Sequence, residues 1–188
     1  ISRENNHLIR LIKLDQNKGV ANARNVCVEN ARGEFICFFD DDDYSYESRI
    51  KSQLTELIQF EKDHNDKNSF KRTALCYTDR LIHYENKKII ICKSMQIKQF
   101  NKYKIQYINS MLYASKFPSA GRPGSTASCT LFARRTIFYE LSMFNNSLRR
   151  GEDTEFAIRA LINDVELIST SSILVDQYYS HTLDKKNN

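Results

Sequence analysis

Four consecutive aspartates, residues 40–43, directly follow an apolar run at residues 35–39. Like charges this close repel one another, and partial burial at the end of a core strand makes each charge costlier. A bound divalent cation would relieve both costs. If the strand continues into the acidic run, Asp40 and Asp42 share one side and the other two aspartates face the opposite side. An Asp-x-Asp pair of this kind supplies the oxygen ligands that Mg²⁺ and Mn²⁺ prefer.

The acidic run has two other interpretations. A calcium-binding loop that begins at Asp40 needs glycine at its sixth position and glutamate at its twelfth, where this chain has Ser45 and Lys51. The spacing therefore argues against calcium. A solvated acidic turn ahead of a helix N-terminus, where negative charge is favourable, stays open.

A second pair of carboxylates, Glu152 and Asp153, stands at the predicted start of a helix, directly after Arg149, Arg150 and Gly151. The pair could serve structure alone, because the helix dipole and the neighbouring arginines both stabilise negative charge there. It could also act chemically, because a carboxylate held in a cleft can take a proton from a hydroxyl nucleophile.

A third stretch, residues 17–25, reads by itself as a turn, a helix start and a surface arginine. It lacks the glycines of a loop that cradles phosphate.

Hydrophobic periodicity predicts the elements that must position these residues. Strands are expected at residues 8–14, 35–39, 74–78, 81–84, 88–92, 129–133, 165–168 and 173–179, and helices at 20–31, 50–61, 105–113, 136–143 and 152–162. The first helix is expected to bury a face made of Val20, Ala23, Cys27 and Ala31, with Gly33 as its C-cap. Residues 62–71 and 115–128 are expected to be loops. Together these elements predict one α/β domain with a mixed sheet over residues 1–188.

Composition narrows the class of protein. The chain is 41% hydrophobic and 27% charged, as in an ordinary globular domain. A formal net charge of +5 suits an anionic substrate or a membrane surface and is too small to indicate nucleic acid. Five cysteines without a C-x-x-C pair indicate neither a disulfide framework nor a zinc site, so reduced and mostly buried thiols are expected.

The three motifs, in this order, resemble those of glycosyltransferase family 2. Residues 17–25 match the family's N-x-G-x-x-x-A-R-N stretch, residues 40–43 its D-x-D-D after an apolar strand, and residues 151–153 its G-E-D. The resemblance covers nearly the whole chain from Leu8 onward. It implies the GT-A fold, in which a Rossmann-like nucleotide-binding sheet flanked by helices merges with an acceptor-binding part. Here residues 1–80 would bind nucleotide and metal, and residues 81–188 would bind the acceptor and carry the catalytic base.

The resemblance also implies roles on the donor side. Asp42 and Asp40 would coordinate Mg²⁺ or Mn²⁺ bridging the diphosphate of a nucleotide-diphosphate sugar, with Asp40 close to the donor itself. Asp41 would lie near the donor sugar or ribose. His181 resembles a C-terminal histidine that meets the metal or the diphosphate in some relatives.

On the acceptor side, Asp153 would be the base that deprotonates the acceptor hydroxyl, and Glu152 would contact the acceptor. The predicted helix at 105–113 and the loop at 115–128 are the expected sources of further acceptor contacts. Attack from the face opposite the leaving nucleotide would invert the anomeric configuration.

The family normally opens with a strand–helix–strand unit that holds the nucleobase and ribose, and this sequence starts past it. The resemblance therefore implies an N-terminally truncated form of the fold with an exposed sheet edge. Residues 1–188 alone are expected to have weak or no transferase activity, and their sequence does not identify the donor nucleotide.

The implied partners are a nucleotide-diphosphate sugar and a glycan or lipid-linked glycan acceptor, in surface polysaccharide synthesis. Without a recognisable signal peptide or bilayer-spanning run, a cytoplasmic location is expected, with peripheral contact at the inner face of the membrane left open. Two alternatives stay open. One is a non-catalytic carbohydrate-binding module derived from a transferase, and the other is a metal-dependent phosphate-transfer enzyme such as a nucleotidyltransferase.

Overall fold

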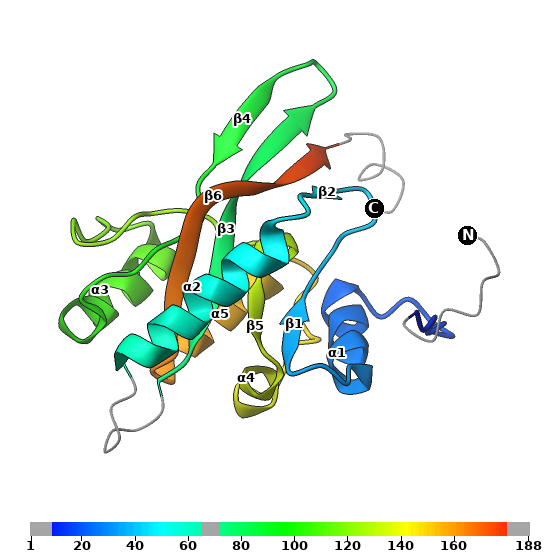
Figure 1. The fold of residues 1–188 in the computed structure, drawn as a ribbon, viewed down its shortest axis with the longest axis horizontal. Coiled ribbons are helices and arrows are strands. Elements are labelled where there is room, and N and C mark those ends of the chain that lie inside the picture. Colours follow the sequence, from blue (N-terminus) through cyan, green and yellow to red (C-terminus); the bar gives the residue numbers. More distant parts are fainter. Residues whose placement is uncertain (1–8, 65–71, 180–188) are drawn as a thin grey trace.

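A mixed β-sheet runs through the centre of the protein (Figure 1), whose computed structural model describes residues 9–64 and 72–179. Within these residues the sheet has six strands: β1 (Phe35–Cys37), β2 (Tyr44–Ser45), β3 (Ala74–Tyr84), β4 (Ile89–Cys92), β5 (Phe132–Arg134) and β6 (Glu166–Tyr179). The strand order is β1-β5-β3-β6-β2, with β4 paired to β3. Strands β3 and β6 are parallel and the other pairs are antiparallel. The predicted α/β fold with a mixed sheet is confirmed.

Helices cover both faces of the sheet. They are α1 (Val20–Asn30), α2 (Arg49–His64), α3 (Phe100–Tyr113), α4 (Arg135–Glu140) and α5 (Glu152–Ile162), with a short 3-10 helix at Ser128–Thr130. Figure 1 shows α2 in front of the sheet and α5 behind it. Side chains of β3 alternate accordingly: Leu75 and Tyr77 join one buried cluster, and Ala74 and Cys76 join the other. Burial on both faces explains why the strands read as continuous apolar runs.

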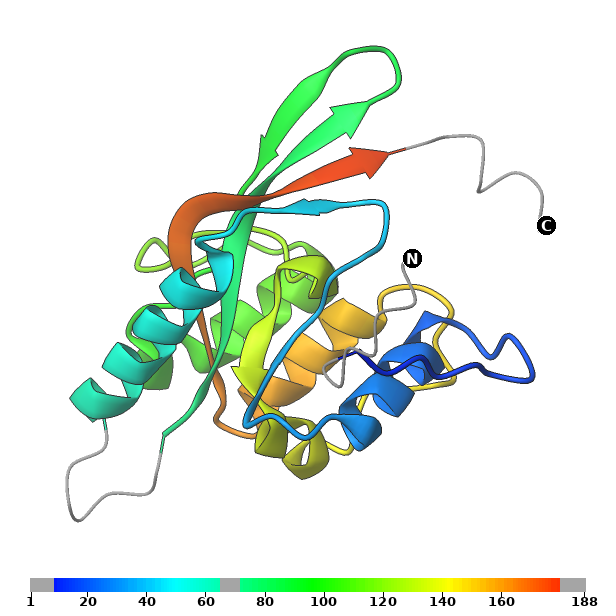
Figure 2. The ribbon, with the colours of Figure 1, turned by 45° about the vertical axis from the view of Figure 1, so that its right-hand side comes forward.

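Strands β3 and β6 each join two segments that the sequence predicts as separate strands. The polar residues at the predicted breaks stay in the sheet because they bond one another. Thr78 Oγ1 donates to the Ser172 carbonyl oxygen at 2.5 Å and accepts from Thr170 Oγ1 at 3.1 Å. The register shifts around Asp79, which bends the pair without ending it. Beyond the bend, the β3–β4 hairpin and the end of β6 project past the helices (Figure 2).

The strand predicted at residues 8–14 is wrong for the described part, residues 9–14. These residues form no strand and all are exposed, with Leu11 at 92%. A strand needs a neighbour for its backbone groups. Strand β1, the end of the sheet, pairs with β5 on one edge and with no other described strand.

The predicted buried face of α1 is also wrong. Val20 and Cys27 are exposed, and the helix instead buries Ala21, Asn25 and Val28. Asn25 is buried because its amide serves the backbone of Phe144: Nδ2 donates to the carbonyl oxygen and Oδ1 accepts from the N–H, both at 2.9 Å. The Asn25 amide thus takes the place of water for the backbone carbonyl and N–H of Phe144. Hydrophobic periodicity alone does not predict a buried polar residue of this kind.

We expect Asn25→Ala to lower the free energy of unfolding by about 2–4 kcal/mol, because it leaves two buried backbone groups of Phe144 unpaired. Urea denaturation measures the change. Asn30→Ala is the matched control on the same helix, since Asn30 makes exposed bonds, and a loss below about 1 kcal/mol is expected there. Equal losses for the two variants would contradict the role of Asn25.

Other boundaries differ in detail. Helix α1 ends with Ala31 as its C-cap in place of Gly33, and α3 begins at Phe100, earlier than predicted. Helix α2 extends through His64 into the predicted loop 62–71, and the rest of that loop, residues 65–71, lies outside the described residues. Helix α4 is shorter than predicted and ends at Glu140. The five cysteines are free, but Cys76 and Cys129 alone are fully buried. None of the described helices is long and apolar enough to cross a membrane.

Candidate active site between the acidic turn and helix α5

The four aspartates form a turn, which we call the acidic turn (residues 40–43). Strand β1 ends at Cys37, and the Asp43 N–H donates to the Asp40 carbonyl oxygen at 3.3 Å. The predicted alternation of side chains through this run is therefore wrong. The turn brings together Asp40 and Asp43, whose ligand atoms lie with Cys129 Sγ within 4.8 Å of one another. Asp41 and Asp42 are exposed on the same turn.

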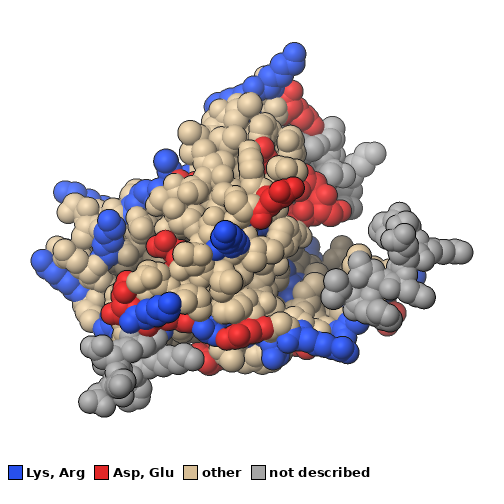
Figure 3. All heavy atoms as spheres, in the orientation of Figure 1, with Lys and Arg blue, Asp and Glu red and all other residues tan. Residues whose placement is uncertain are grey.

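The two grouped carboxyls are costly to ionise. Burial raises the pKa of Asp43 to about 6, and the charge of Asp40 adds to the shift. Burial likewise raises the pKa of Asp40, while the charge of Arg24 opposes it. Asp43 Oδ1 accepts from the Tyr178 N–H at 3.3 Å, but its buried Oδ2 has no partner among the described residues. In Figure 3 acidic side chains gather beside β2, which follows this turn.

A divalent cation fits this pair of carboxylates. An unpartnered buried oxygen beside a second carboxylate is a hard-oxygen donor set, the kind that Mg²⁺ and Mn²⁺ take. The neighbouring thiol is a poor ligand for such ions, since burial raises the pKa of Cys129 to about 12. His181, the other metal ligand expected from sequence, lies outside the described residues.

Arg24 joins the acidic turn to the start of α5. Its guanidinium donates to Glu152 Oε1 at 2.6 Å and lies 3.9 Å from Asp40 Oδ1. The rings of Phe38 and Phe144 both lie 5.9 Å from its central carbon, and the side chain is 13% exposed. One buried cation therefore holds together two acidic groups that are far apart in sequence.

Asp153 stands beside Glu152 in the first turn of α5. Gly151 precedes the helix with φ of 75°, a left-handed conformation that suits glycine. Asp153 Oδ1 accepts from the Thr154 N–H at 2.7 Å, and the carboxylate lines a pocket of about 340 Å³. Burial raises the pKa of Tyr77 well above its ordinary value, and the charge of Asp153 adds to the shift.

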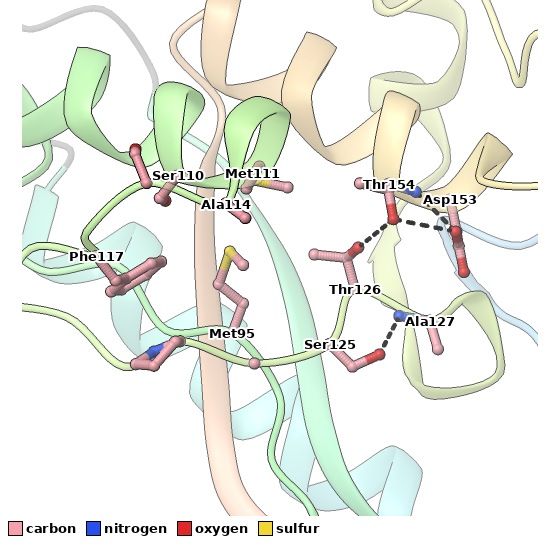
Figure 4. A pocket seen from close by; sticks show the side chains of 13 residues that line it. Met95, Ser110, Met111, Ala114, Phe117, Ser125, Thr126, Ala127, Asp153 and Thr154 are labelled. Atoms are coloured by element: carbon pink, nitrogen blue, oxygen red, sulfur yellow. Dashed lines mark hydrogen bonds between the residues drawn. The ribbon is translucent and has the colours of Figure 1, made fainter.

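The pocket lies between the end of α3, the segment that follows α3 and the start of α5, and Met95, which precedes α3, completes its lining (Figure 4). Ser110 and Met111 come from α3, and Phe117 and Ser125 come from the long segment. The structure thus brings Asp153 together with both segments expected to supply acceptor contacts.

A buried ion pair fixes the long segment against the sheet. Asp79, fully buried on β3, accepts from the Ser94 N–H at 2.8 Å and from Arg122 at 2.9 Å. Burial alone would raise the pKa of Asp79, but the bonds from Ser94 and the charges of Arg122 and Lys93 outweigh it and lower the pKa.

Asp79→Asn should therefore lower the free energy of unfolding by about 2 kcal/mol at neutral pH. A carboxyl whose pKa is lowered by folding stabilises the fold above its unfolded pKa, about 4, and this contribution is lost as pH falls through the lower folded value. The difference in unfolding free energy between variant and wild type should then shrink as the pH falls below about 4, as measured by urea unfolding. Asp164→Asn, which changes an exposed carboxylate just after α5, is the control. A stability loss for Asp79→Asn that does not depend on pH, or that is as small as the loss for Asp164→Asn, would refute the ion pair.

Sequence reasoning missed three residues of this region. It treated Arg24 as a surface side chain, it grouped Asp40 with Asp42 in place of Asp43, and it gave Asp79 no role. For Arg24 a signal existed, since it lies within the matched N-x-G-x-x-x-A-R-N stretch. The other two depend on a turn and on a contact distant in sequence.

Comparisons with known proteins identify the family and the fold. The family model for glycosyl transferase family 2 matches residues 2–135. An uncharacterised glycosyltransferase of Rickettsia conorii is 30% identical over 139 residues, which are 73% of this chain and 18% of that protein. One from Rickettsia felis is 27% identical over 139 residues, 73% of this chain and 19% of that protein. The chain thus spans less than a fifth of the length of these relatives.

Among solved structures, S. aureus TarS residues 1–349 in complex with UDP-GlcNAc superposes with a TM-score of 0.59 at 16% identity. The superposition covers 92% of this chain and 42% of that one, and it establishes the GT-A-like fold. With most of its length matched by the family model, the chain belongs to glycosyltransferase family 2.

Proposed function

We propose that the chain takes part in metal-dependent transfer of a sugar from a nucleotide-diphosphate sugar to a glycan hydroxyl, with inversion. The observation that carries the proposal is the Arg24 bridge, which links Asp40 of the acidic turn to Glu152, the neighbour of Asp153. A diphosphate at the acidic turn and a hydroxyl at Asp153 would then face one another across a short span.

In the proposed reaction Asp153 takes the proton of the acceptor hydroxyl. The hydroxyl oxygen then attacks the anomeric carbon as its bond to the diphosphate breaks, from the opposite face, so the configuration inverts. The Thr154 N–H, which donates to Asp153 Oδ1, orients the carboxylate. Glu152 would contact the acceptor, although its pairing with Arg24 also gives it a positioning role.

Asp40 and Asp43 would hold Mg²⁺ or Mn²⁺, with Asp42, the ligand suggested by the family resemblance, exposed on the same turn. When bound, such an ion acts as a Lewis acid that neutralises charge on a leaving diphosphate. Asp41, also exposed, is the proposed neighbour of the donor sugar.

UDP is the nucleotide to test first, because the TarS structures were solved with UDP-GlcNAc and with UDP. A glycan or lipid-linked glycan is the proposed acceptor. Surface polysaccharide synthesis in the cytoplasm, with peripheral contact at the inner face of the membrane, is the proposed setting.

Binding of Mn²⁺ tests the donor side without any turnover. We expect Asp40→Asn and Asp43→Asn each to weaken Mn²⁺ binding at least about ten-fold, because each removes an anionic ligand. Calorimetric titration with Mn²⁺, alone and with UDP, measures the change. Asp63→Asn, an exposed acidic residue on α2, is the matched control. Unaltered Mn²⁺ affinity in both acidic-turn variants would contradict the proposed metal site.

A further inference from the structure

The residues that line the pocket at Asp153 are almost all uncharged. Of the 13 residues that line it, Asp153 is the one ionisable group. The rest are apolar or small neutral residues, with hydroxyls from serine and threonine. Figure 4 shows Met95, Met111 and Phe117 on one side of the view and Asp153 with Thr154 on the other.

Three cations lie near the pocket, and none of them lines it. Arg80 donates through Nη1 to the Ser125 hydroxyl at 2.9 Å and through Nε to Gln177 Oε1 at 2.8 Å. Arg122 lies in the segment that forms one wall, but its guanidinium pairs with the buried carboxylate of Asp79 at 2.9 Å. Lys116 is exposed and does not line the pocket. A phosphate or carboxylate entering the pocket would therefore meet the charge of Asp153 with no cation among the lining residues to offset it.

We propose that this pocket binds a single uncharged sugar unit of the acceptor and rejects units that carry phosphate or carboxylate. The inference rests on the proposed function, in which Asp153 is the base. It adds the chemical class of the acceptor, which family membership leaves undefined.

Size and surface both suit such a unit. A volume of about 340 Å³ is at the small end for ligand pockets, as a monosaccharide requires. A pyranose has apolar C–H faces that can pack on Phe117 and the two methionines, and hydroxyls that can bond to Ser125 or Thr126. One hydroxyl would point to Asp153 at the other side of the pocket.

Methionine methyl NMR tests the proposal directly. The chain has three methionines: Met95 and Met111 line the pocket, and Met143 packs against the core elsewhere. The probes are methyl glycosides of glucose, galactose, mannose and N-acetylglucosamine, compared with glucuronate and glucose phosphate. We expect at least one neutral glycoside to shift the Met95 and Met111 signals and to leave Met143 unchanged. The charged sugars should bind about ten-fold more weakly or not at all.

Two variants sharpen the result. Phe117→Ala should abolish the shifts caused by the neutral glycoside, whereas Tyr139→Ala, an exposed aromatic residue on α4, should preserve them. Ser115→Lys, which places a cation among the lining residues, should let glucuronate shift Met95 and Met111. Because Ser115 is exposed, this change leaves the core intact.

The proposal is overturned if no neutral glycoside moves the two pocket methyls, or if the charged sugars move them equally. Either result is independent of donor binding. If Mn²⁺ and UDP still bind through the acidic turn, the proposed function stands and the acceptor class is wrong. If sugars bind and Mn²⁺ does not, the reverse holds.

Discussion

Replacement of Asp153 by asparagine is expected to slow sugar transfer by about 10²–10⁴-fold, the contribution typical of a general base. Asparagine keeps the shape of the side chain, and its carbonyl can still accept from the Thr154 N–H. It cannot take a proton from the acceptor hydroxyl. Release of nucleotide diphosphate in the presence of acceptor, by the product of the full open reading frame, measures the rate.

Two comparisons make this result specific. Binding of UDP with Mn²⁺ should be unchanged in Asp153→Asn, because the acidic turn is intact. Asp164→Asn removes an exposed carboxylate just beyond the other end of α5 and should leave transfer unchanged. A nucleotidyltransferase would not need the base at this helix. An Asp153→Asn variant that transfers sugar at the wild-type rate would remove Asp153 from the base role.

The fold was predictable where a residue's neighbours in sequence decide its environment. Sequence patterns predicted the apolar runs of β3 and β6 and the apolar stripe of α5, because these segments pack against continuous surfaces. Residues 9–14 show the limit of this reasoning. They have a strand-like composition, yet they stay exposed because no described strand lies beside them. Strand formation depends on a partner, which a local pattern does not report.

The site followed the same division. The acidic run and the carboxylates at the start of α5 were singled out by residue type, and their expected roles came from the family resemblance. The pairing within the acidic run was not predicted, because a turn in place of a strand decides that Asp43, and not Asp42, lies next to Asp40. Likewise, nothing near Asp79 in the sequence indicates Arg122, because the two meet through the bend in β3 and the return of the long segment.

The Arg24–Glu152 pair should dominate the stability of the site. Both side chains are largely buried, with exposures of 13% and 9%, and their atoms lie 2.6 Å apart. We expect Arg24→Met to lower the free energy of unfolding by about 3–5 kcal/mol, because it leaves the Glu152 carboxylate buried without its cation. Urea denaturation at neutral pH measures the loss. Arg159→Met is the control on α5, since its pair with Glu155 is more exposed and contributes about 0.5 kcal/mol or less.

A double-mutant cycle separates the pair from its surroundings. Glu152→Gln keeps a neutral acceptor for Arg24, which stays near Asp40 at 3.9 Å, so its own loss should be smaller. Once Glu152 is neutral, adding Arg24→Met should remove much less stability than it does in the wild type, because no buried charge is stranded at position 152. Additive losses would mean that Arg24 acts through its packing between Phe38 and Phe144. The ion pair would then not be what couples the acidic turn to the helix that carries Asp153, and the proposed site would lose its central contact.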